Sequence, residues 1–348
     1  MRRYGKILAR FLAKASLTGE LNMTNAFCSK FGIRQPIVLA PMGRVGPPEL
    51  VAAVSNAGGL GLAPLWTDAP DKMRAEIRRI KELTDKPFGV NLNMDFRNEA
   101  QLDVCLEEGV DVISIFWGEP GNFVERAKSH GAKVIITAST SAVAKEAVAL
   151  GADAICAQGW EAGGHVEGKV STMALVPAVA DTVGDVPVIA AGGIADGRGL
   201  AAALALGASA AWIGTRFLAA KEAPTHPVYM ERLLAASEDD TSHYDDLYDL
   251  VWPNAPHRAL KNSTSEMWDA AGRPPLGQRP GEGDILALRP DGVEIPRYAS
   301  AVAFAGLEGE IEPLPMWSGQ GVGLVTKIQT AEEIVREIVE QAKTIINF

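Results

Sequence analysis

From residue 36 onward the sequence repeats one unit, which is a short continuous apolar run followed by a longer helical stretch. The unit recurs about every 20–25 residues, which is the length of one βα repeat. The apolar runs do not alternate with polar residues, which is typical of parallel strands buried on both faces. The pattern therefore predicts βα units around a parallel sheet. We expect strands at Ile37–Ala40, Leu60–Ala63, Phe88–Leu92, Val112–Ile115, Val134–Thr137, Ala154–Gln158, Val188–Ala191 and Ala210–Ile213.

Helical patterns separate these runs. Eight strand–helix units favour a closed TIM (β/α)8 barrel over an open doubly wound sheet. An open sheet of six or seven strands remains the alternative if one strand is assigned wrongly. The helices are expected at Pro48–Asn56, Lys72–Leu83, Glu99–Glu108, Gly121–Ser129, Ser141–Leu150, Ala174–Val183 and Gly197–Leu206.

The repeat stops after Phe217, and residues 223–315 are richer in Pro, Asp, Trp and His. This change predicts a smaller lobe inserted after the barrel, with helices at Val228–Ala236 and Ala259–Ala270. Residues 316–348 are expected to return to the barrel and to end in an amphipathic helix, Thr330–Ile346, which Thr330 and Glu333 would cap. The predicted division is a 1–22 extension, a 23–222 barrel that binds the cofactor, a 223–315 substrate or lid lobe and the 316–348 return segment.

Composition excludes several classes of function. The net charge of -10 argues against a nucleic-acid partner, because phosphate-backbone binding needs clustered Lys and Arg. Three cysteines, Cys28, Cys105 and Cys156, form no CxxC pattern and suit a reducing, cytoplasmic compartment. No apolar run reaches the 18 residues or so of a transmembrane helix. A small-molecule substrate is expected, and a homodimer remains open.

The first 22 residues are basic, with Arg2, Arg3 and Lys6 among the cations that precede the first acid, Glu20. They are either a targeting or membrane-surface helix or an extension outside the compact domain.

Glycine-bearing loops follow several predicted strands. TIM barrels place their sites on the loops at the carboxyl ends of the strands, and the loops after strands seven and eight often bind phosphate. Gly192-Gly193 and Gly214-Thr215 occupy those two positions, where glycine lets backbone N–H groups approach an anion. Taken singly they could be turn residues only; together they predict a phosphate site. Ala40, Pro41, Met42 and Gly43 follow the first strand.

His165 follows Gly163 and Gly164 at the exit of the sixth strand, where it would project into the mouth of the barrel. Its unperturbed pKa of about 6.5 suits proton transfer near neutrality. The other four histidines are expected to be structural, and no HxH or HExxH pattern predicts a metal site.

Further polar and aromatic residues are weaker candidates for the site. Asn91 and Gln158 could bind the edge of a heterocycle, Glu161 is a second acid or base or else a carboxylate at a helix start, and Trp160 and Trp317 could wall a substrate pocket.

These segments resemble the nitronate monooxygenase family, formerly called 2-nitropropane dioxygenases, which also contains FMN-type enoyl-acyl-carrier-protein reductases and NAD(P)H:quinone reductases. The resemblance runs from about residue 30 to the end, and its most specific part is Glu161–His165. It is carried in order by Pro36–Met42, Gly58–Gly61, Gly89–Asn91, Glu161–His165, Ala190–Ile194, Ile213–Phe217, Arg258–Asn262 and Ser318–Gly321.

The resemblance implies non-covalent FMN, with its phosphate on Gly192, Gly193, Gly214 and Thr215. Its ring system would lie against Ala40–Gly43, Asn91 and Gln158, with His165 facing the substrate. Two departures bear on the activity. Thr137 stands where some members carry a Lys near the flavin, and a Tyr- and Lys-bearing C-terminal segment of one nitronate-oxidising class is not found.

Several functions follow from this. The leading hypothesis is oxidation of nitroalkanes or nitronates with dioxygen, His165 being the general base. The alternative is an NAD(P)H-dependent reductase acting on a quinone or an enoyl thioester, with His165 as proton donor; the long lobe could cover such a substrate. A flavin-free barrel acting on a sugar phosphate explains the phosphate loops but not the histidine segment. A non-enzymatic ligand-binding module fits worst, because nothing in it would require a histidine at the mouth of the barrel.

Overall fold

The computed structural model describes residues 25–96 and 99–346. Eight parallel strands form one sheet in the order β1-β9-β8-β6-β5-β4-β3-β2. A parallel bridge between Val38 and Leu60 joins β1 to β2, and the Leu39 amide donates to the Leu60 carbonyl at 2.9 Å. The sheet therefore closes into a TIM barrel, as predicted. Its strands are β1 (Ile37–Leu39), β2 (Gly61–Pro64), β3 (Phe88–Asn93), β4 (Val112–Phe116), β5 (Lys133–Ala138), β6 (Ala154–Gln158), β8 (Val188–Ala191) and β9 (Ala210–Ile213).

Helices cover the outside of the barrel and contribute to one large apolar core with the strands. The predicted barrel helices are present, with small shifts at their ends. None of the described helices is long and apolar enough to cross a membrane. They are α3 (Pro48–Asn56), α4 (Pro70–Leu83), α5 (Glu99–Glu107), α6 (Phe123–Ser129), α7 (Ser141–Ala149), α8 (Thr172–Val183), α9 (Gly197–Ala205) and α12 (Ala331–Ile346).

The C-terminal helix α12 takes the place of the eighth barrel helix, because it packs against both α9 and α3. Its buried face comprises Ile334, Val335 and Ile338 among others. The predicted capping box is present: the Glu333 amide donates to Thr330 Oγ1 at 3.2 Å, and the Thr330 amide donates to Glu333 Oε2 at 2.8 Å. The chain thus leaves the barrel after β9 and returns to complete it.

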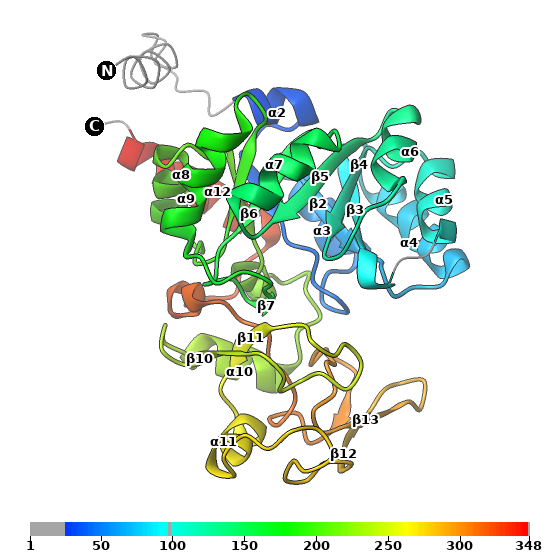
Figure 1. Ribbon diagram of the computed structural model, residues 1–348, viewed down its shortest axis with the longest axis vertical. Coiled ribbons are helices and arrows are strands. Elements are labelled where there is room, and N and C mark those ends of the chain that lie inside the picture. The colour runs from blue at the N-terminus through cyan, green and yellow to red at the C-terminus, as the bar shows by residue number, and fades with distance from the viewer. Residues whose placement is uncertain (1–24, 97–98, 347–348) are drawn as a thin grey trace.

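A short helix, α2 (Ala26–Phe31), lies at the opposite end of the barrel from the inserted lobe (Figure 1). Its Phe27 and Phe31 are buried in a cluster with inward-facing residues of the strands, such as Val38 and Ile135. This end of the barrel is therefore filled by side chains, and the carboxyl ends of the strands face the lobe.

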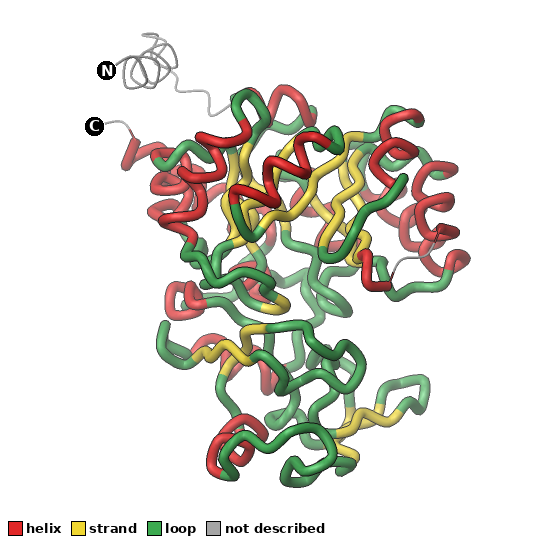
Figure 2. The backbone as a smooth tube through the Cα atoms, in the orientation of Figure 1, coloured by secondary structure: helices red, strands yellow, loops and turns green. Residues whose placement is uncertain are grey.

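The lobe consists of short elements joined by long loops (Figure 2). Two small antiparallel sheets form, β10-β11-β7 and β13-β12-β14. One member, β7, belongs to the loop after β6 rather than to the lobe segment itself. The elements are β7 (Gly164–His165), α10 (Pro227–Ala235), β10 (Thr241–Tyr244), β11 (His257–Leu260), α11 (Ser263–Ala270), β12 (Ile285–Leu288), β13 (Glu294–Pro296) and β14 (Glu308–Gly309).

The predicted helix Ala259–Ala270 is wrong in its first part. Ala259 and Leu260 are buried strand residues of β11, and the helix begins only after Asn262. Asn262 has an extended backbone (φ -151°) and forms a reciprocal cap with Ser265: its Oδ1 accepts from the Ser265 amide at 3.0 Å. The cap fixes the start of the helix, which apolar periodicity alone does not reveal.

Candidate active site

A cavity of about 510 Å³ lies between the carboxyl ends of the barrel strands and the lobe. The lobe contributes several lining residues between Arg289 and Phe304, and the loop before β11 contributes Leu250, Val251 and Trp252. All twelve residues expected to contact the cofactor line this one cavity: Ala40, Pro41, Met42, Gly43, Asn91, Gln158, Gly163, Gly164, Gly192, Gly193, Gly214 and Thr215.

The loop after β8 has the backbone that close approach to a ligand requires. Gly192 and Gly193 have φ values of +105° and +71°, which L side chains rarely adopt. A Cβ on Gly192 would lie 3.0 Å from the Ala162 amide nitrogen and from the Gly159 carbonyl oxygen. A side chain at position 192 would therefore press on the loop after β6. Thr215 begins a short 3₁₀ helix (Thr215–Ala219), and its Oγ1 accepts from the Gly319 amide at 3.0 Å.

Two amide side chains lie at the ends of β3 and β6. Asn91 is buried, and its Nδ2 donates to Ser114 Oγ at 3.1 Å. Gln158 Nε2 donates to the His165 carbonyl at 3.0 Å, whereas its Oε1 is buried and has no partner. Since an unpaired buried acceptor is costly, this oxygen is suited to an N–H donor of a bound ligand.

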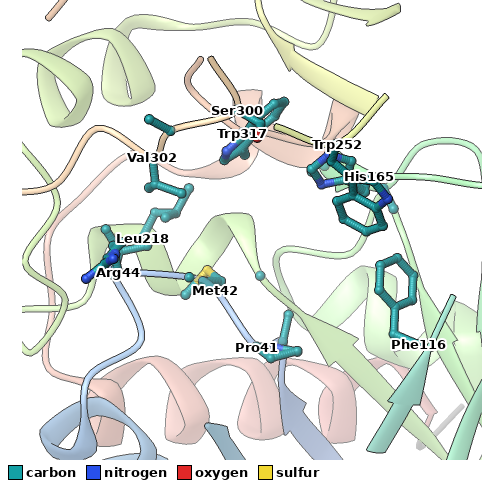
Figure 3. Close-up of a pocket in the computed structure, with 18 of the residues that line it drawn as sticks. Pro41, Met42, Arg44, Phe116, His165, Leu218, Trp252, Ser300, Val302 and Trp317 are labelled. Atoms are coloured by element: carbon teal, nitrogen blue, oxygen red, sulfur yellow. The ribbon is translucent and has the colours of Figure 1, made fainter. Parts of the chain in front are cut away.

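His165 lies on β7, which pairs with β11 of the lobe in the register His165–His257. Its ring centroid is 4.1 Å from that of Trp252, 5.3 Å from that of Trp317 and 5.7 Å from that of His257. Figure 3 shows Trp252 against His165. The Nε2 atom of His165 is buried and has no hydrogen-bond partner.

This environment lowers the pKa of His165 well below its usual range, chiefly because burial disfavours the charged imidazolium and also because His257 is near. At neutral pH the ring is therefore neutral, and one ring nitrogen is free to accept a proton. The ring is therefore in the form that can accept a proton, and it carries no imidazolium proton to donate.

Trp252 is a site residue that the sequence did not predict. Its indole Nε1 donates to Asp95 Oδ2 at 2.9 Å, which fixes the ring beside His165. Phe116 and Phe96 pack edge-on against the same ring and also line the cavity. No motif marks residue 252, because it lies in an irregular segment of the lobe.

The two tryptophans expected to wall the pocket lie in different places. Trp317 lines the cavity, and its carbonyl accepts from the buried Tyr229 hydroxyl at 2.7 Å. Trp160 is not among the lining residues; the guanidinium of Arg258 stacks 4.6 Å from its ring centroid.

Glu161, the expected second acid or base, does not line the cavity either. Its Oε2 accepts from the Thr172 amide at 2.8 Å, so it caps α8 and serves as a helix-start carboxylate.

Comparison with known proteins identifies the family. A profile described as nitronate monooxygenase matches residues 25–101 and 93–341. The chain belongs to the nitronate monooxygenase family. A nitronate monooxygenase of Pseudomonas aeruginosa is 34% identical over 370 residues, covering 92% of this chain and 100% of that protein.

One further relative and two solved structures show the breadth of the group. A (3aS,4S,5R,7aS)-5-hydroxy-7a-methyl-1-oxo-octahydro-1H-indene-4-carboxyl-CoA dehydrogenase of Mycobacterium tuberculosis is 39% identical over 245 residues, covering 70% of this chain and 67% of the relative. Among solved structures, FabK from Thermotoga maritima superposes with a TM-score of 0.77 at 34% identity, covering 93% of this chain and 97% of that one. A nitroalkane oxidase from Streptomyces ansochromogenes superposes with a TM-score of 0.74 at 28% identity, covering 92% and 98%.

Membership of this family makes the protein an oxidoreductase, and its members are in general flavoenzymes. The cavity fits a flavin on grounds of its own. It offers glycine loops without Cβ atoms at one edge and an unpaired amide acceptor, Gln158 Oε1, at the end of β6. Thr137, where the resemblance implies Lys in some members, also lines the cavity beside Cys156. Burial raises the pKa of the Cys156 thiol to about 12, so it stays protonated.

Proposed function

We propose that the protein is an FMN-dependent oxidoreductase that oxidises alkyl nitronates or nitroalkanes with dioxygen, and that His165 is its general base. The observation that carries the proposal is the buried, partnerless Nε2 of a neutral His165 in the wall of the cavity. FMN would be held by Ala40–Gly43, Asn91, Gln158, Gly163, Gly164 and the loops Gly192-Gly193 and Gly214-Thr215. When bound, it supplies the electron-accepting ring that protein side chains lack.

The remaining chemistry belongs to the chain. The imidazole of His165, which lines the cavity, takes the α-proton of a nitroalkane, and with a preformed nitronate it orients the anion instead. Trp252 and Trp317 both pack against the imidazole and shield it from water. A low pKa weakens the base, but it also keeps nearly every molecule in the deprotonated form.

A second candidate is an NAD(P)H-dependent reductase acting on a quinone or an enoyl thioester. The contribution of the lobe to the cavity wall favours it, because such a wall could enclose a large substrate. It is also supported by the relative described as a carboxyl-CoA dehydrogenase. It requires His165 to be protonated when it acts, which the lowered pKa opposes.

The experiment mixes the purified holoenzyme anaerobically with NADH, NADPH or propionate 3-nitronate and follows the flavin absorbance. Nitronate monooxygenase chemistry predicts a change with the nitronate and none with either nicotinamide. Rapid bleaching by a nicotinamide would instead establish the reductase.

His165→Asn then tests the base. We expect a loss of about 10²-fold or more in turnover of a neutral nitroalkane, and a smaller loss with its preformed nitronate, from which the proton is already gone. The matched control is His130→Asn, because His130 is exposed at the end of α6 and outside the cavity. Equal losses with both substrates would show that His165 is structural.

A further inference from the structure

Among its described lining residues, the cavity has one arginine without an ion-pair partner, and the proposed chemistry does not use it. Among its described lining residues, three side chains carry a formal charge, Arg44, Arg289 and Glu294. Arg289 already donates to Asp291 Oδ2 at 2.6 Å. Arg44 forms no ion pair or side-chain hydrogen bond with any residue of 25–96 or 99–346, although most arginines in these ranges, such as Arg74 and Arg79 of α4, are paired.

Arg44 is also held in an unusual conformation. Its φ is +64°, one of five positive values among the described non-glycine residues. It ends a turn in which the Val45 amide donates to the Met42 carbonyl at 3.2 Å, and Val45 is buried in the core between barrel and lobe. A residue with a Cβ rarely adopts this conformation, and such outliers gather at ligand sites. In this turn Arg44 is among the residues that line the cavity.

The position of Arg44 separates it from the reacting end of the cavity. Arg44, Thr67, Val251 and Val293 are exposed as well as lining the cavity, so they lie where it opens to solvent. In Figure 3, Arg44 and His165 lie at opposite ends of the labelled residues, with Met42 between them. A molecule that reacts beside His165 and extends past Met42 brings its far end to Arg44.

We propose that Arg44 forms a subsite for an anionic group at the end of the substrate remote from the reacting carbon. This rests on the proposed function and narrows its substrate class to molecules with a carboxylate or a phosphate beyond an apolar spacer. The spacer would lie along Met42, Leu218 and Val302, which line this part of the cavity and carry no charge. Glu294, on β13, is the one carboxylate among the described lining residues.

The test compares two nitronates of the same shape. The nitronate of 6-nitrohexanoate carries a carboxylate beyond a methylene chain, and the nitronate of 6-methyl-1-nitroheptane has an isopropyl group in its place. For Arg44→Gln we expect the KM of the carboxylate substrate to rise about tenfold or more, because a charge-assisted hydrogen bond is lost. The KM of the neutral-ended substrate should change less than about twofold, and kcat should stay within about twofold for both.

Two control variants accompany it. Arg44→Lys keeps the charge and should retain most of the preference for the carboxylate. Arg79→Gln removes a surface arginine of α4 that pairs with Glu49 and Glu82, and it should leave both KM values unchanged. The preference of the wild type should also shrink with added salt, whereas Arg44→Gln should show no preference at any ionic strength.

Competing anions distinguish the two sources of the charge. Inorganic phosphate and acetate are tested as inhibitors of the neutral-ended substrate. Stronger competition by phosphate, abolished in Arg44→Gln, would assign the subsite to a phosphate group; equal or stronger competition by acetate would assign it to a carboxylate. Absence of competition by either anion, with KM values unaffected by the variant, would overturn the proposal.

Failure of the proposed function gives a different result. If the wild type turns over neither nitronate, anaerobic calorimetry with the same two ligands still reports their affinities. A preference for the carboxylate ligand that disappears in Arg44→Gln would support the subsite without the activity. Loss of bound flavin from Arg44→Gln would instead assign the guanidinium to the cofactor phosphate and refute the proposal.

Discussion

Alanine in place of Gly163 or of Gly164, the two glycines before His165, should lower the stability of the protein, but for a different physical reason at each position. An alanine Cβ at position 163 would lie 2.4 Å from the Gly319 amide nitrogen and 2.5 Å from the Ser318 carbonyl carbon, where ordinary contacts begin at 3.4 Å. The Ser318–Gly319 backbone would have to retreat by about 1 Å, which costs about 1–3 kcal/mol in a packed region. The retreat also removes the Gly319 N–H···Oγ1 bond to Thr215, worth about 1 kcal/mol. Gly163→Ala should therefore lower the free energy of unfolding by about 2–4 kcal/mol.

At position 164 the cost is conformational. A Cβ there meets no atom within 4 Å, but the φ of +73° disfavours any side chain by about 1–2 kcal/mol. Urea unfolding followed by circular dichroism, with flavin content measured in parallel, compares the two variants. Gly163→Ala should be the less stable and should lose flavin, because residues 318–319 adjoin the cavity. Equal stabilities, or a less stable Gly164→Ala, would refute the steric reasoning.

Three further predictions concern buried polar groups. Tyr229→Phe leaves the Trp317 carbonyl without its partner and should cost about 1–3 kcal/mol, measured by urea unfolding; unchanged stability would contradict it. Burial lowers the pKa of His257 to about 4. Between pH 6.5 and 4 the unfolded chain therefore binds a proton that the folded protein does not. The free energy of unfolding should fall with falling pH in that window, by up to about 1.4 kcal/mol per pH unit. His257→Gln should reduce this slope in unfolding curves recorded across the window, and an unchanged slope would count against the assignment. Arg279→Met leaves the buried carboxylate of Asp249 without its ion-pair partner and should lower the free energy of unfolding by about 3–5 kcal/mol. Adding Asp249→Asn should restore part of this loss in the double variant. Additive losses would argue that the pair is not coupled.

The barrel could be predicted because its signals are local. Each strand is a continuous apolar run and each helix a periodic one, so Ala154–Gln158 and Val188–Ala191 were placed to the residue. The carboxyl ends of parallel strands meet at one face, which is why residues as far apart as Ala40 and Thr215 could be expected in one site.

The surroundings of His165 could not be predicted, because they come from the irregular lobe. Trp252 and His257 reach His165 through tertiary contacts that have no periodic signature. Trp160 and Trp317 both lie in glycine-flanked loops, so the sequence could not distinguish them. The difference arises from Arg258, whose side chain is 1% exposed and donates from Nη2 to the Trp160 carbonyl at 3.1 Å.

The lobe therefore does more than cover the cavity, since it holds the residue on which the proposed chemistry depends. β7 forms no ladder with the barrel sheet; its partner is β11, and the next residue, Val166, donates its amide to the Pro256 carbonyl at 2.8 Å. Arg258 fixes the start of the same loop at Trp160. The barrel supplies the loops suited to a cofactor, while the lobe fixes the base over them. His165 is hydrogen-bonded to both parts, to Gln158 of β6 and to β11 of the lobe, so changes in either part of the chain act on the same reacting geometry.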